Sequence, residues 1–285
     1  MTLIVGWVSA DNKPRGKQIS ALYFASDSRY TWKQHGRDVV ICQTDYGKKL
    51  FASSKYPEIF GFCGDVFLSK HLIEGLIALI DSGTFFNTSE TLCSKVQKVT
   101  TYFEAILSEF PDRQRANCII LYGTKVGRHF HLETYDILKD NITHEGVELP
   151  NVSTVVCSDG SGKQLFSENW IYANNEKANE YNLSRGVYHC LSETIETVEK
   201  NDIGGVPQLV GIYRGLQTPT IFGIIKNGKR YIDGKEFLGD ITLLDNIEWR
   251  NDNFERVNPY TLKLQEGAQA QPFVKKRVNS VKVRP

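Results

Sequence analysis

The order of apolar runs and periodic segments predicts an α+β protein, a four-layer αββα sandwich in which two antiparallel sheets pack face to face between helices. Short apolar runs typical of strands occur in three groups along the chain. Between these groups lie two pairs of segments whose apolar residues recur every three or four positions, which is typical of amphipathic helices. Such layers are expected from the order strands, two helices, strands, two helices, strands. In this arrangement each sheet packs one face against the other sheet and the opposite face against a pair of helices.

The first half of the chain supplies one group of strands and the first helix pair. Residues 3–9 and 19–26 are predicted to form a hairpin with a long polar loop at 11–17. Residues 39–42 and 48–51 are predicted to form another short pair, followed by a strand that begins at residue 59. Helices are predicted over 65–82 and over 89–109, with a cap at Ser89 and an end before Pro111.

The second half repeats the order. Residues 118–123, 129–135 and 153–157 are predicted strands, and 163–170 and 186–199 are predicted helices. The closing strands are predicted at 208–213 and 220–226, with a turn at Asn227-Gly228. We expect one domain over residues 1–236 and a C-terminal extension over 237–285. The extension ends in a basic tail that is predicted to be partly disordered.

Length and composition exclude several classes of protein. The 285 residues are ample for a sizeable core, and a net charge of +1 argues against general binding of nucleic acid. Apolar runs fall well short of the roughly 20 residues of a membrane span, and the N-terminus lacks a signal pattern. The six cysteines are scattered without paired spacing, so we expect reduced thiols in a cytoplasmic protein, with no metal site and no cofactor.

Thr2, directly behind the initiator Met, is the first candidate for chemistry. Removal of Met1 would leave a threonine that carries both a hydroxyl nucleophile and a free α-amine. The amine has an unperturbed pKa of roughly 7.7–8.0, so part of it is neutral near pH 7 and can act as a base. Met-Thr is also an ordinary beginning, and this feature alone decides nothing.

Six short motifs, taken in order, resemble a proteasome β-type subunit. They lie at residues 2–6, 24–29, 48–51, 61–64, 158–162 and 202–205. The resemblance covers residues 2–226, and because Thr2 directly follows Met1 in this sequence, we expect a likeness to the simpler bacterial relatives without a propeptide. It implies an N-terminal-nucleophile (Ntn) hydrolase with an αββα sandwich, usually built into rings.

The resemblance also implies a set of catalytic residues. Thr2 would attack the scissile carbonyl, and its own amine would take the proton. Lys49 would hold that amine neutral, and Asp27 would pair with the lysine. Gly64 would stabilise the oxyanion through its backbone N–H, and Ser161 would help to orient the amine. Considered one at a time, these residues have plainer interpretations: a strand-end turn for Asp27, a solvated charge for Lys49 and a strand-to-helix turn for Gly64.

A substrate pocket follows from the same resemblance. The positions implied for the residue before the cleaved bond hold apolar, aromatic or small side chains and no charge, so small or medium apolar residues are expected there. These positions are Tyr30, Gly47, Phe51, Phe62 and Val66.

Three functions remain open at this point. The first is a threonine peptidase acting on peptides or proteins within a homo-oligomeric ring or helical assembly. The second is an amidase of the same fold that acts on a small molecule. The third is a catalytically silent structural subunit of a ring. No nucleic-acid or membrane partner is expected, and the sequence leaves open whether an ATPase or other adaptor takes part.

Overall fold

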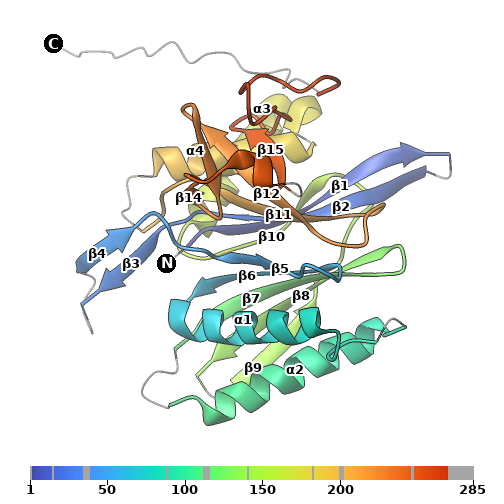
Figure 1. The fold of residues 1–285 in the computed structure, drawn as a ribbon, viewed down its shortest axis with the longest axis vertical. Coiled ribbons are helices and arrows are strands. Elements are labelled where there is room, and N and C mark those ends of the chain that lie inside the picture. The colour runs from blue at the N-terminus through green and yellow to red at the C-terminus, as the bar shows by residue number, and fades with distance from the viewer. Residues whose placement is uncertain are drawn as a thin grey trace.

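Two sheets lie face to face at the centre of the molecule, and a pair of helices covers the outer side of each (Figure 1). This computed structural model describes every residue except 1, 15, 35–38, 88, 112–115, 140, 182, 199–201, 245–246 and 269–285. The α+β class and the four-layer αββα order are confirmed.

The first sheet is eight-stranded and runs in the order β10-β1-β2-β11-β12-β13-β14, with β15 joined to β12. Its neighbours are antiparallel, except that β15 runs parallel to β12. Two helices, α3 (Lys163–Tyr181) and α4 (Ser184–Thr197), lie on its outer face (Figure 1). The strands are β1 (Ile4–Lys13), β2 (Gly16–Ser26), β10 (Thr154–Asp159), β11 (Gln208–Tyr213), β12 (Thr220–Lys226), β13 (Lys229–Ile232), β14 (Lys235–Glu236) and β15 (Ile247–Asn251).

The second sheet is a five-stranded antiparallel meander, β5-β6-β7-β8-β9. Its outer face is covered by α1 (Val66–Ser82) and α2 (Leu92–Glu109). Its strands are β5 (Leu50–Ala52), β6 (Glu58–Gly64), β7 (Cys118–Val126), β8 (His129–Leu138) and β9 (Asn141–Gly146). A separate two-stranded pair, β3 (Tyr30–Lys33) and β4 (Val40–Thr44), projects beside the N-terminus (Figure 1).

Three apolar layers hold the sandwich together, and β1 contributes to two of them. Successive side chains of a strand point to opposite faces. Val5 and Trp7 therefore pack under α3 and α4, whereas Ile4 and Val8 pack between the sheets. A third layer lies between the five-stranded sheet and α1 and α2. A strand buried on both faces has a continuous apolar run, and this explains why the start of β1 lacks alternation.

Local chemistry fixes the ends of the first two helices. Asp65 caps α1 by accepting a hydrogen bond from the Leu68 N–H, and Gly83 ends this helix with a φ of 77°, a conformation that suits glycine. Thr91 caps α2 by accepting from the Ser94 N–H. The predicted cap at Ser89 is therefore wrong by two positions.

Other predicted boundaries also need correction. Residues 11–17 do not form a long loop, because β1 continues to Lys13 and β2 begins at Gly16. The predicted pairing of residues 39–42 with 48–51 is wrong, since β4 pairs with β3 and β5 pairs with β6. The structure also lengthens the predicted helix at 163–170 to residue 181 and adds β9, which the sequence analysis did not predict.

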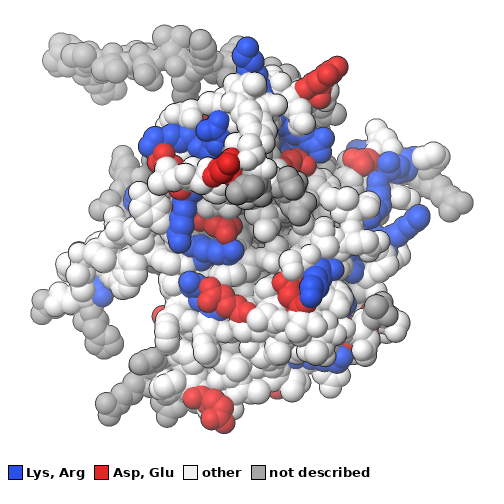
Figure 2. All heavy atoms as spheres, viewed as in Figure 1, with Lys and Arg blue, Asp and Glu red and all other residues white. Residues whose placement is uncertain are grey.

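The C-terminal part joins the first sheet. The short helix η2 (Ile241–Leu243) leads into β15, which pairs with β12, so the sheet extends past residue 236, where the predicted domain ends. Residues 269–285, which hold most of the predicted basic tail, lie outside the described residues. Within the described part of the chain, no helix is long and apolar enough to cross a membrane. Basic and acidic side chains are intermixed on the face drawn in Figure 2.

Candidate active site

Thr2, Asp27 and Lys49 lie together at one end of the two facing sheets. Thr2 precedes β1 and Asp27 follows β2, and these antiparallel strands place Ile4 opposite Ser26. Lys49 precedes β5 in the other sheet. Each of the three residues is at most 1% exposed. The structure therefore brings together the residues that the sequence analysis names as nucleophile, lysine and aspartate.

The Asp27 carboxylate organises this end of the fold. Its Oδ1 accepts hydrogen bonds from Lys49 Nζ at 2.8 Å and from the Leu3 N–H at 2.9 Å. Its Oδ2 accepts from the N–H groups of Arg29 at 3.0 Å and Gly204 at 3.2 Å. The Leu3 N–H belongs to the peptide bond that follows Thr2. One oxygen therefore fixes both the lysine and the backbone next to the candidate nucleophile.

Burial controls the charge of Lys49. Removal from water lowers the pKa of Lys49, and the Asp27 carboxylate opposes this shift by favouring the ammonium. The Lys49 Nζ also lies 5.9 Å from the centre of the Tyr30 ring, within the range of a cation–π contact. The lysine can consequently release its proton at a lower pH than an exposed lysine.

A glycine turn after β10 contacts Thr2 from the other side. The Gly162 N–H donates to the Thr2 carbonyl oxygen at 3.3 Å. Gly160 has a φ of 96°, and a Cβ at this position would lie 2.0 Å from the same oxygen. Only glycine permits this approach. Ser161 lies between the two glycines, and its role in orienting the amine stays a prediction.

Gly64 ends β6 and also requires glycine. Its φ is 99°, and a Cβ there would lie 2.6 Å from the Asn117 carbonyl oxygen. Gly64 is exposed and lines a hollow of about 570 Å³ between β3 and α1. Its N–H as an oxyanion donor stays a prediction.

The predicted pocket residues fall into two groups. Tyr30 and Val66 line the hollow next to Gly64, whereas Phe51 and Phe62 are packed in the apolar layer under α1. Gly47 lies against the Tyr30 ring, where a Cβ would be 2.4 Å from the ring carbons. The role of these five positions in selecting substrate stays a prediction.

The hollow also has walls that the sequence analysis did not name. Its remaining lining residues combine polar and charged groups with two exposed aromatic rings. They are Thr31, Trp32, Asp65, Phe67, Lys70, His71 and Glu74. Lys70 and Glu74 form an ion pair at 3.3 Å along one face of α1. Charge is therefore present in the hollow, although the five predicted positions carry none.

Sequence reasoning also missed the residues that hold Lys49 and Asp27 in place. Gln208, at the start of β11, accepts from the Lys49 N–H at 3.0 Å and donates to the Gly47 carbonyl oxygen at 2.5 Å. The Arg29 guanidinium binds both carboxylate oxygens of Asp45, at 2.6 and 2.9 Å. A polar residue within an otherwise apolar strand is a signal for Gln208, but the sequence does not tell which groups it contacts.

The nearby thiol of Cys63 is not an alternative nucleophile. Burial raises its pKa to about 12, so the reactive thiolate is scarce near neutral pH. Among the residues that the structure describes, no cluster of His, Cys, Asp and Glu is arranged to hold a metal ion.

Comparisons with known proteins return a likeness of fold only. No protein-family model matches the chain, and no curated protein matches it. Among solved structures, Anbu (ancestral β-subunit) from Yersinia bercovieri is 14% identical over 77% of this chain and 87% of that chain, with a TM-score of 0.48. A Gly-1 mutant of Anbu from Hyphomicrobium sp. strain MC1 is 15% identical over 75% of this chain and 81% of that chain, with a TM-score of 0.45.

These findings correct the resemblance derived from the motifs. The assignment to a bacterial-type relative of the proteasome β-subunits is wrong, because no family model matches and the likeness to the two solved structures is confined to the fold. What the fold and the site define is a class: an αββα sandwich with a buried Asp–Lys pair at the N-terminal end of its first strand.

Proposed function

We propose that the chain is an amide or peptide-bond hydrolase in which Thr2, freed by removal of Met1, is the nucleophile. The observation that carries the proposal is the shared Asp27 Oδ1, which binds both Lys49 Nζ and the Leu3 N–H. A lysine–carboxylate pair with no exposed surface is costly to bury. A role in chemistry at the adjacent residue gives a reason for that cost.

The reaction would proceed in two steps. In the first, the Thr2 hydroxyl attacks the substrate carbonyl, its proton passes to the Thr2 α-amine, and the N–H of Gly64 stabilises the oxyanion. The C–N bond then breaks, the proton goes to the leaving amine, and the acyl group remains as an ester on Thr2. In the second, water attacks the ester with the α-amine as base, releasing the acid. Lys49, held by Asp27, favours the neutral amine because a nearby ammonium disfavours a second positive charge.

A specific test combines mass with activity. The intact mass of the purified protein reports whether the chain begins at Thr2. Thr2→Ala removes the hydroxyl and should reduce hydrolysis of peptide and small amides to background, whereas Thr2→Ser retains a hydroxyl and should keep measurable turnover. Circular dichroism checks that both variants are folded. Undiminished turnover by folded Thr2→Ala would refute the mechanism.

The hollow next to Gly64 favours a second candidate, an amidase for a small molecule. Its volume of about 570 Å³ lies within the range of roughly 300–1,000 Å³ that is usual for small ligands. Turnover of small amides without turnover of peptides would select this candidate. A catalytically silent structural role would be selected by retention of Met1 and absence of turnover with both substrate types.

We also propose that the chain associates with itself. Apolar side chains are exposed beside the site, among them Ile41 on β4 and Phe67 on α1, at 68% and 61%. Contact with another copy would remove this surface from water. Sedimentation velocity at micromolar concentration tests this, and a monomer would refute it.

A further inference from the structure

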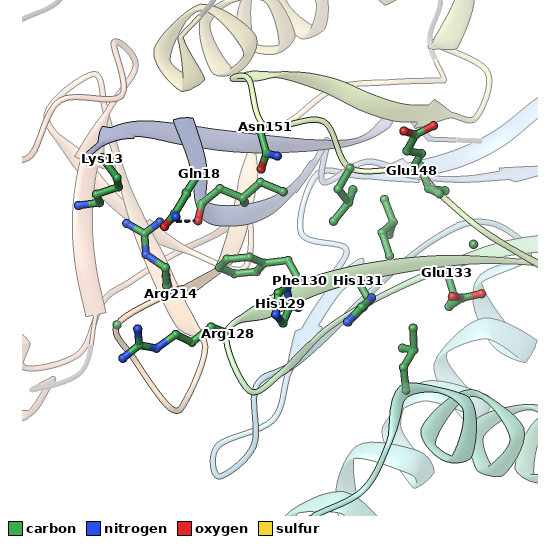
Figure 3. Close-up of a pocket in the computed structure, with 17 residues that line it drawn as sticks. Lys13, Gln18, Arg128, His129, Phe130, His131, Glu133, Glu148, Asn151 and Arg214 are labelled. Carbon is green, nitrogen blue, oxygen red and sulfur yellow. Dashed lines mark hydrogen bonds between the residues drawn. The ribbon is translucent and has the colours of Figure 1, made fainter. Parts of the chain in front are cut away.

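A second and larger hollow lies at the other end of β1 from Thr2 (Figure 3). Its volume is about 1210 Å³. β1 begins at Ile4, near Thr2, and ends at Lys13 on the rim of this hollow. With about 3.3 Å per residue, the two ends of the strand are roughly 30 Å apart. The hollow is therefore separate from the candidate active site, and the proposed hydrolysis does not use it.

The floor of this hollow is apolar and comes from both sheets. Ile19 belongs to β2, Phe130 and Leu132 belong to β8, and Leu149 follows β9. Phe130 and Leu132 are also part of the apolar layer between the sheets, and Ile19 and Leu149 pack against that layer. The hollow thus opens onto the core of the sandwich, where an apolar group can be removed from water.

One side of the rim is cationic. Lys13, Arg128 and Arg214 come from the end of β1, the β7–β8 turn and the segment after β11. In Figure 3 these side chains lie on one side, whereas Glu133 and Glu148 lie on the other. Figure 2 shows blue side chains at the right of the molecule, where Figure 1 places the β1–β2 hairpin.

The positive charge of this side is incompletely neutralised. Asp11 lies 3.4 Å from Arg214 and 4.0 Å from Lys13, so one carboxylate serves two cations. Arg214 is held in place because its guanidinium donates to the Ile19 carbonyl oxygen at 2.9 Å. Within the described part of the chain, Arg128 forms no hydrogen bond or ion pair. Its donors are free to bind a ligand.

We propose that this hollow binds a small amphipathic carboxylate, its carboxylate at Arg128, Arg214 and Lys13 and its apolar chain over Phe130. Guanidinium groups bind carboxylates through two parallel hydrogen bonds, which suits an anionic head. Most ligand pockets combine an apolar lining with a few polar groups that fix orientation, as this one does. The acidic side chains of Glu133 and Glu148 lie on the other side of the hollow, away from this cationic group, so the two sides differ in charge.

Three probes of eight carbons each separate charge from hydrophobic contact. Octanoate, 1-octanol and octylamine carry a negative, a neutral and a positive head at pH 7.5. Octanoate should raise the melting temperature of the protein and show binding in isothermal titration calorimetry. Both effects should be smaller with 1-octanol and smallest with octylamine. Acetate, which has the head without the chain, should give no shift. Equal effects of the three eight-carbon probes, or an effect of acetate equal to that of octanoate, would overturn the proposal.

Variants locate the binding. Arg128→Glu should weaken the binding of octanoate by about tenfold or more, which is the effect expected for a lost charge-assisted hydrogen bond. Arg128→Gln should weaken the binding less. Lys235→Glu on β14 makes the same change in net charge at a remote exposed position and should leave binding unchanged. Lys70→Glu changes the hollow near Gly64 and should also have no effect. An effect of Lys235→Glu or Lys70→Glu as large as that of Arg128→Glu would overturn the proposal, whatever the result for Thr2.

Discussion

Replacing Asp27 by Asn tests the buried network directly, because the substitution keeps the size of the side chain and removes its charge. The carboxylate accepts from two donors at each oxygen. An amide offers one acceptor oxygen, and its NH₂ group is itself a donor. In either orientation of the amide, two of the four donors therefore lose their acceptor.

The expected loss of stability follows from these contacts. Each buried donor left without a partner costs about 1–3 kcal/mol. Removing one partner of a buried ion pair costs about 3–5 kcal/mol. These two energies describe overlapping effects and are not added. We therefore expect Asp27→Asn to lower the free energy of unfolding by about 4 kcal/mol in urea denaturation at pH 7. Asp45→Asn is the matched control. Asp45 pairs with Arg29 but has a side chain that is 41% exposed, and we expect its loss to cost about 1 kcal/mol or less.

The pH dependence gives the test a second readout. Burial lowers the pKa of Lys49, so the folded state holds this proton less tightly than the unfolded state. Between the lowered pKa and the usual lysine value of 10.5, the unfolded state binds more protons, and the Lys49 contribution to stability rises with pH. The loss of stability caused by Asp27→Asn should therefore be smaller at alkaline pH. Lys49 is then neutral, so the substitution removes hydrogen bonds to Asp27 but no ion pair. A loss no larger than that of Asp45→Asn, or one unchanged with pH, would refute the reasoning.

Two further substitutions test the turns around the site and the start of α2. Gly160→Ala should destabilise the fold by about 2–3 kcal/mol in urea, because its φ of 96° and its approach to the Thr2 carbonyl both exclude a Cβ, whereas Gly215→Ala, with nothing within 4 Å, should change stability by less than about 0.5 kcal/mol. Equal effects of the two would contradict the structure of the glycine turn. The hydrogen bond from the Asn87 N–H, followed by contacts with α2 side chains, lowers the pKa of Glu90 from 4.5 to about 2. Its stabilisation is present above pH 4.5 and is lost as the pH falls toward 2, so wild type and Glu90→Gln should converge in stability over that window, and a constant difference would contradict this assignment.

The sequence predicts best those strand segments whose side chains are apolar and buried on both faces of the sheet. Residues 4–8 of β1 and most of β2 are buried, and their apolar runs alone indicate strands. The distal ends of the same strands are exposed and polar. Their sequence therefore indicates a loop, although they continue the hairpin. β9 was missed for the same reason, because its residues are polar and largely exposed at the edge of its sheet. Exposure removes the alternation on which strand prediction depends.

The residues of the candidate site were predicted more completely than its surroundings. Thr2, Asp27 and Lys49 are singled out by the ordered series of motifs and not by their chemical types alone, and the structure places them together. Lys70 belongs to the polar pattern of an amphipathic helix, and nothing in that pattern tells that it lines a hollow. Its place depends on how β3 lies over α1, and this arrangement is set by tertiary packing.

Burial of a lysine does not by itself identify a functional site, as a second pair in the same molecule shows. Lys95 on α2 pairs with Glu58 on β6, and both are largely buried. Tyr122 and Thr124 complete its hydrogen bonds, so this network joins α2 to the five-stranded sheet and every partner is a side chain. The Asp27–Lys49 pair differs because the same carboxylate also binds the backbone next to Thr2. The connection to the chain's first residues, and not burial, is therefore the feature on which the proposed hydrolase rests.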